Sequence, residues 1–130
     1  MILSIIIPVF NERNTILELL NKIEKIRSIE KEVIIVDDCS TDGTKEILLN
    51  LNNPIYKIFF HERNTGKGGA IKTAKNYVSG QIIIIQDADL EYDPRDYYKM
   101  LNLISIKNKV IYGSRVLGKN RYLSKKFSSF

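Results

Sequence analysis

Apolar residues follow two alternating patterns along the chain. Short, fully apolar runs such as Ile82–Ile85 are typical of strands that are buried on both faces of a sheet. Between these runs, apolar residues recur at the spacing of one helix face, as in residues 15–29. The pattern predicts strands at Leu3–Pro8, Glu32–Asp37, Ile55–Phe60, Gln81–Gln86 and Lys109–Tyr112. It predicts helices at Thr15–Ile29, Thr41–Leu51, Gly66–Val78 and from Pro94 to about Ile104.

Strands that alternate with helices imply right-handed βαβ units, so the sequence predicts an α/β fold with a mainly parallel sheet. The chain has 130 residues, and we expect residues 1–130 to form one domain. The apolar runs are strand-sized, shorter than a membrane span or a signal-peptide core. A single cysteine, Cys39, leaves no partner for an internal disulfide and is consistent with a reducing cytoplasm.

Charge is distributed unevenly. The whole chain carries a formal net charge of +5, yet residues 97–130 contain eight Lys/Arg and no Asp/Glu. This basic C-terminal part, with a tail at about 116–130, indicates either an anionic partner or a solvated, lysine-rich surface. The anionic partner could be a phosphate-bearing ligand, a membrane surface or a nucleic acid. No aromatic or groove-reading motif accompanies the charge, so we expect no nucleic-acid partner.

Acidic residues follow the ends of two predicted strands. Asp87 and Asp89, separated by the small Ala88, come directly after the predicted strand Gln81–Gln86, and Asp38 follows the second strand. Open α/β sheets bind ligands at the carboxyl ends of their strands. Two carboxylates at this spacing can bind one divalent cation, although capping of the next helix is the simpler explanation. Asp38 is a candidate acceptor for the N–H of a nucleobase, whereas Thr41 or Asp42 is expected to cap a helix.

The first predicted strand ends with Pro8, and Phe10 and Glu12 follow it. They either begin the next helix or lie beside a bound nucleotide. Further along, residues 64–70 are rich in glycine but match neither the P-loop nor the dinucleotide fingerprint. They predict a cationic helix N-terminus, with Lys67 able to approach an anion, or a close helix–sheet contact. His61 lacks zinc-binding neighbours in the sequence, and we expect a hydrogen-bonded structural imidazole.

Five motifs occur together and in one order: S-I-I-I-P-V-F-N-E, V-D-D-C-S-T-D-G-T, N-T-G-K-G-G-A, Q-D-A-D-L-E-Y-D-P and G-S-R. In combination they resemble the family-2 inverting glycosyltransferases of the GT-A fold. The resemblance is strongest to the dolichyl- or polyprenyl-phosphate sugar synthases and covers residues 4–115. It implies a Rossmann-like GT-A sheet flanked by helices, and the donor-binding part of such an enzyme.

The resemblance also implies a nucleotide-sugar site. Its base and ribose pocket would be lined by Pro8, Phe10, Glu12, Val36 and Asp38. Its sugar–diphosphate end would be held by Lys67, Asp87, Ala88, Asp89 and Arg115. A divalent metal, Mg²⁺ or Mn²⁺, would be bound by Asp89 and Glu91. Asp89 and Arg115 would be the catalytic residues.

The expected reaction is transfer of a sugar, with inversion, from a UDP- or GDP-linked donor to a polyprenyl or dolichyl phosphate. The protein would then be cytoplasmic, either free or peripheral on the cytoplasmic face of a membrane. Relatives of this kind continue well beyond G-S-R into an acceptor-binding half, whereas this sequence ends fifteen residues after Arg115. A donor-binding module without turnover is therefore the alternative. A receiver-type signalling domain fits less well, because its acidic pair would follow the first strand.

Overall fold

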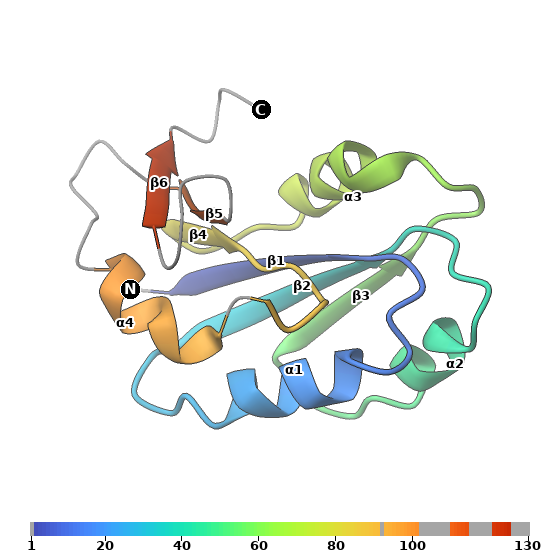
Figure 1. Cartoon of the computed structure of the whole chain (residues 1–130), viewed down its shortest axis with the longest axis horizontal. Coiled ribbons are helices and arrows are strands. Elements are labelled where there is room, and N and C mark those ends of the chain that lie inside the picture. Colours follow the sequence, from blue (N-terminus) through green and yellow to red (C-terminus); the bar gives the residue numbers. More distant parts are fainter. Residues whose placement is uncertain (1, 92, 102–109, 115–120, 126–130) are drawn as a thin grey trace.

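The strands form one six-stranded sheet (Figure 1). A computed structural model describes residues 2–91, 93–101, 110–114 and 121–125, with side chains up to Leu101 apart from Met100. The strands are β1 (Leu3–Val9), β2 (Lys31–Asp37), β3 (Tyr56–Phe60), β4 (Ile82–Ile85), β5 (Val110–Ser114) and β6 (Arg121–Lys125). Their order is β3-β2-β1-β4-β5-β6. All neighbours are parallel except β5 and β6, which are antiparallel.

Helices cover both faces of the sheet (Figure 1). They are α1 (Ile16–Glu24), α2 (Thr44–Leu49), α3 (Gly66–Lys75), the 3₁₀ turn η1 (Pro94–Asp96) and α4 (Tyr97–Leu101). One buried cluster joins α1, α2 and α4 to alternate residues of β1, such as Ile5 and Ile7. A second cluster joins α3 to Ile6 on the opposite face. The strands β1, β2 and β4 are thus buried on both faces, which explains their continuous apolar runs.

Strand β1 runs through Pro8 to Val9, one residue further than the sequence predicts. The Val9 carbonyl accepts from Asp38 N–H, so the backbone polar groups of Val9 point towards β2. Those of Pro8, the residue before it, therefore point towards β4. Gln86 N–H donates to the Ile6 carbonyl at 2.8 Å, so the next donor in the ladder between β1 and β4 would be the N–H that Pro8 lacks. Pro8 therefore ends the pairing of β1 with β4.

Other element boundaries also differ from the predictions. A helix was predicted over residues 15–29, whereas helix α1 ends at Glu24. Ile26, beyond the end of the helix, is still buried in the same cluster. Strand β6 lies in the predicted basic tail and was not predicted. Its pairing with β5 is a tertiary contact that a five-residue pattern does not reveal. No helix in the described part of the chain is long and apolar enough to span a membrane.

Candidate functional site

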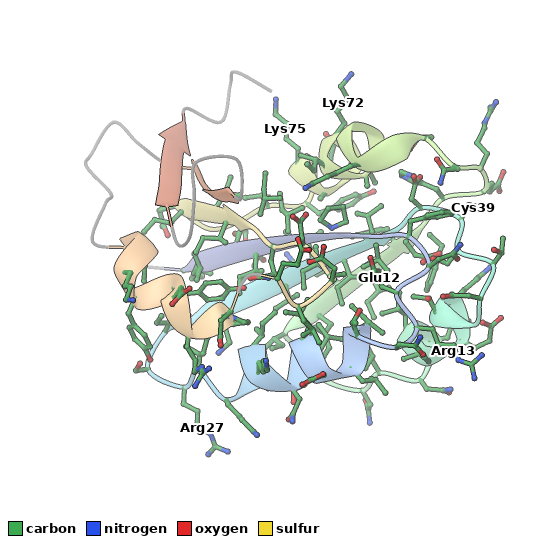
Figure 2. The ribbon with its side chains drawn as sticks, viewed as in Figure 1. Glu12, Arg13, Arg27, Cys39, Lys72 and Lys75 are labelled. Carbon is green, nitrogen blue, oxygen red and sulfur yellow. The ribbon has the colours of Figure 1, made fainter. Side chains whose placement is uncertain are left out.

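A cavity of about 280 Å³ opens where β1, β2 and β4 end. Open α/β sheets place their ligand sites at this edge. The lining residues are Pro8, Val9, Phe10, Glu12, Asp38, Lys67, Ala70, Asp87, Ala88 and Asp89. Figure 2 shows Glu12 at this end of the sheet. Eight of the expected site residues therefore share one cavity. Val9 and Ala70 were not expected to line it, although each belongs to one of the quoted motifs.

Two of the expected site residues that the structure describes do not line the cavity. Val36 is fully buried in the core on the α3 face of the sheet. Glu91 is exposed, and its backbone N–H donates to Asp89 Oδ1 at 3.2 Å. Arg115 lies outside the described residues, so its predicted role stays a prediction.

The wall of the cavity beside α1 is acidic. Thr15 Oγ1 lies 3.1 Å from Glu12 Oε2 and donates to the Ala88 carbonyl at 2.6 Å, which ties the loop after β1 to the loop after β4. Burial raises the pKa of Glu12, and the nearby carboxylates of Asp89, Asp42 and Asp87 raise it further, against the hydrogen bond from Thr15. The carboxylates therefore repel one another, and a cation would relieve that repulsion.

Lys67 is the only cation among the described residues that line the cavity. Its ammonium lies 2.5 Å from Asp87 Oδ1, joining the start of α3 to the loop after β4. Lys67 comes from the glycine-rich segment, and Asp87 from the loop that follows the isoleucine run. The ion pair thus brings two separate sequence motifs into contact.

The loop after β4 is held by a buried tyrosine of α4 and bends at Leu90. Tyr97 on α4 is fully buried and donates from its hydroxyl to Gln86 Oε1 at 2.8 Å. Leu90 has a φ of 66°, in the left-handed region that a leucine rarely adopts. The bend turns the chain after Asp89, so that Asp87 and Asp89 both line the cavity while Glu91 does not.

The described residues contain no group of three His, Cys, Asp or Glu side chains arranged to hold a metal ion. The donor set nevertheless fits a hard cation. Mg²⁺ is commonly held by one or two carboxylates together with the phosphates of a substrate, and Asp87 and Asp89 provide such carboxylates. Mn²⁺ prefers the same oxygen ligands.

Most acidic side chains in the segment after β2 accept hydrogen bonds from the protein itself. Asp37 is buried and accepts hydrogen bonds from Ser40 N and Oγ. Asp42 Oδ1 accepts from the backbone N–H and hydroxyl of Thr44 at the start of α2. Asp42 thus supports the first turn of α2, while the capping position itself is Gly43. Asp38 is only 3% exposed, although it borders the cavity.

Sequence comparison gives the family. The Glycosyl transferase family 2 profile matches residues 4–129, and the chain belongs to this family. The chain is 30% identical over 115 residues to dolichol-phosphate mannosyltransferase of Pyrococcus furiosus, covering 86% of the chain and 32% of that relative. It is 35% identical over 106 residues to undecaprenyl-phosphate 4-deoxy-4-formamido-L-arabinose transferase of Yersinia pestis, covering 77% of the chain and 32% of that relative. The chain thus spans about a third of the length of these relatives.

Solved structures agree with this assignment. TarS residues 1–349 of S. aureus, in complex with UDP-GlcNAc, match with a TM-score of 0.66 and 31% identity, over 78% of the chain and 31% of that structure. The mannosyltransferase PcManGT of Pyrobaculum calidifontis, in complex with GDP-Man and Mn²⁺, matches with a TM-score of 0.64 and 31% identity, over 74% of the chain and 30% of that structure. The fold is the GT-A arrangement of these transferases, which confirms the predicted fold class and family.

Proposed function

We propose that the cavity binds the nucleotide sugar of an inverting glycosyltransferase. A sugar would pass from a UDP- or GDP-linked donor to a polyprenyl or dolichyl phosphate, with a divalent metal. The observation that carries the proposal is one cavity at the carboxyl ends of the strands, whose lining combines the carboxylates of Asp87 and Asp89 with the ammonium of Lys67, itself paired with Asp87. The names of the relatives support a lipid-phosphate acceptor, and the complexes of the solved structures support a nucleotide-sugar donor.

In this proposal the cavity has two ends. Pro8, Phe10 and Glu12 would face the base and ribose, and the half-exposed ring of Phe10 is available for stacking. Lys67 would contact the diphosphate, and Asp87, Ala88 and Asp89 would hold the sugar–diphosphate end. Val36 would support the base pocket from the core beneath it.

Departure of the nucleoside diphosphate leaves negative charge on its terminal phosphate. Asp89 would hold the metal together with Asp87 beside it in the cavity, and Glu91, the second ligand expected from the resemblance, would have to turn towards the cavity to join them. A bound Mg²⁺ or Mn²⁺ would supply neutralisation of that charge. Lys67 and Arg115 would share it from the protein side. A phosphate acceptor is already an anionic nucleophile, so transfer needs no strong general base. An acceptor of this kind would place the protein at the cytoplasmic face of a membrane.

The first prediction is that nucleotide binding depends on the metal and on Asp89. Asp89→Asn should remove most of the gain in affinity that Mn²⁺ gives to UDP or GDP, a loss of about 1–3 kcal/mol for one charged partner. Calorimetry with each nucleotide, with Mn²⁺ and with a chelator, measures this gain.

Glu30→Gln is the matched control, because it removes an exposed carboxylate at the opposite edge of the sheet. Equal affinity with Mn²⁺ and with chelator in the unsubstituted protein would contradict the metal site. Nucleotide-sugar binding without transfer to a lipid phosphate would favour a binding module.

A further inference from the structure

The carboxylate of Asp38 is surrounded by donors from the protein itself. Its Oδ1 accepts from Thr65 N at 2.8 Å and Thr65 Oγ1 at 3.0 Å, and lies 2.8 Å from His61 Nδ1. Its Oδ2 accepts from Gly66 N at 2.7 Å. Burial alone would raise the pKa of Asp38, but the hydrogen bonds from Thr65, His61 and Gly66 outweigh it and lower the pKa. The carboxylate is therefore held ionised by the loop that precedes α3.

His61 connects this carboxylate to the body of α3. Its other ring nitrogen, Nε2, lies 2.7 Å from Thr73 Oγ1, in the last turns of the helix. An ionised carboxylate only accepts, so Nδ1 carries a proton and donates to Asp38. Since neither His61 nor Thr73 lines the cavity, any effect that they have on a ligand must pass through Asp38 and α3.

The residues that Asp38 holds lead directly to Lys67. Besides Thr65 and Gly66, the side chain of Asn64 donates to the Asp38 carbonyl at 3.3 Å. Gly66 has a φ of 83°, so the chain turns sharply into α3 just before Lys67. Lys72 and Lys75 of the same helix point away from the sheet in Figure 2, whereas Lys67 reaches across to Asp87.

We propose that Asp38, His61 and Thr73 are positioning residues that clamp the start of α3 and hold Lys67 over the cavity for an anionic diphosphate. The inference rests on the proposed function. It gives His61 and Thr73 a role in binding, and it adds a positioning role to the recognition of the base predicted for Asp38. On this account the clamp serves the phosphates and leaves the nucleoside largely untouched.

Thr73→Val tests the clamp, because valine keeps the shape of threonine and removes the partner of His61. Affinity for UDP or GDP should fall about threefold to tenfold, the scale of one weakened charge-assisted contact. Affinity for uridine or guanosine should stay within about twofold, since these ligands lack phosphates. Thr73→Ser keeps the hydroxyl and should bind like the unsubstituted protein. Thr73→Ala replaces Thr73→Val if the latter does not fold.

A double-mutant cycle tests whether Lys67 carries the effect. In a Lys67→Gln background, Thr73→Val should cause no further loss of nucleotide affinity. An equal loss for nucleosides and nucleotides would overturn the proposal, because the effect of Thr73 would then not depend on the phosphates. A loss that persists in the Lys67→Gln background would overturn it as well.

Amide hydrogen exchange separates this inference from the proposed function. Without any nucleotide, Thr65 and Gly66 should exchange about tenfold faster in Thr73→Val and unchanged in Thr73→Ser. Unchanged exchange in Thr73→Val would show that Thr73 does not set the clamp. If the unsubstituted protein binds neither UDP nor GDP, the proposed function fails, while the exchange rates still decide whether the clamp exists.

Discussion

The acidic side chains near the cavity differ in how many hydrogen bonds they accept. Asp37, Asp38 and Asp42 each accept two or more, from their own loop or from the loop before α3. Glu12 and Asp89 face the cavity in a cluster whose charges repel. Residues of the same chemical type in adjacent motifs thus do different work, and stability measurements can tell them apart.

Glu12→Gln should stabilise the folded protein at neutral pH, by up to about 1 kcal/mol for a partly exposed charge. The folded state raises the pKa of Glu12, so the stability linked to this group is present below its ordinary pKa and is lost as the pH rises through the raised value. The gain from Glu12→Gln should therefore appear at pH 7 and vanish near pH 4. Thermal unfolding at both pH values measures it.

Glu18→Gln is the matched control, because Glu18 lies exposed in the first turn of α1, where a negative charge favours the helix. It should be neutral or slightly destabilising. A Glu12→Gln protein that is less stable than the unsubstituted one at pH 7 would show that Thr15 and its neighbours stabilise the charge after all.

At the scale of elements, α3 determines much of the cavity. It packs against β1 and β2 through Ala70 and Ala74 and places Lys67 at the ligand-binding edge. Its glycine-rich start fits no familiar phosphate-binding motif. The structure gives a steric reason for Gly69, because a methyl group there would overlap the side chain of Thr65.

Gly69→Ala should destabilise the protein by about 1–3 kcal/mol, the usual cost of forcing an extra methyl group into a packed site. It should also displace Thr65 Oγ1 from Asp38. Urea unfolding measures the first effect. Gly68→Ala is the matched control, since no atom lies within 4 Å of the added methyl group, and alanine favours a helix over glycine by up to about 1 kcal/mol. Equal effects of the two substitutions would contradict the steric argument.

At the scale of the whole molecule, a second polar cluster lies at the end of the sheet opposite the cavity, where β2 begins. Glu32 at the start of β2 accepts from Ser4 of β1, Lys57 of β3 and Ser79 after α3. Burial alone would raise the pKa of Glu32, but these hydrogen bonds outweigh it and hold the pKa at about 2. One carboxylate thus joins three strands and the segment that follows α3.

Stability should therefore fall as the pH drops from about 4.5 towards 2. The folded pKa of Glu32 is lowered from 4.5 to about 2, so its contribution is present above the ordinary pKa and is lost below it. The shift corresponds to roughly 3 kcal/mol. Glu32→Gln should lose a comparable amount at pH 7 and flatten the acid dependence, as measured by urea unfolding at pH 7, 4 and 3. Glu30→Gln changes an exposed neighbour and should retain the steep dependence of stability on pH. Parallel pH profiles for Glu32→Gln and the unsubstituted protein would rule out the stabilising role of Glu32.

The sequence by itself determined the class of fold and the edge where the site lies. Apolar runs such as Ile82–Ile85 exist because a strand covered on both faces has no polar side, so the run alone predicts a parallel sheet. Parallel strands bring their carboxyl ends to one edge, and therefore residues as distant as Glu12 and Asp87 could be predicted to meet. The hydrogen-bonded imidazole of His61 was also predicted, and the structure confirms it.

The tertiary structure decided which of these side chains face the cavity and which are buried in the core or hydrogen-bonded to other parts of the protein. Val36 belongs to the core because the alternation of β2 turns it towards α3, and the run of apolar residues does not specify which side each one takes. The four donors around Asp38 come from positions 61–66, a set that spacing alone cannot select. Strand β6 forms through pairing with β5. In each case the local sequence allows several conformations of similar free energy. Contacts with residues distant in the sequence determine which of them is adopted, and these contacts form only in the folded chain.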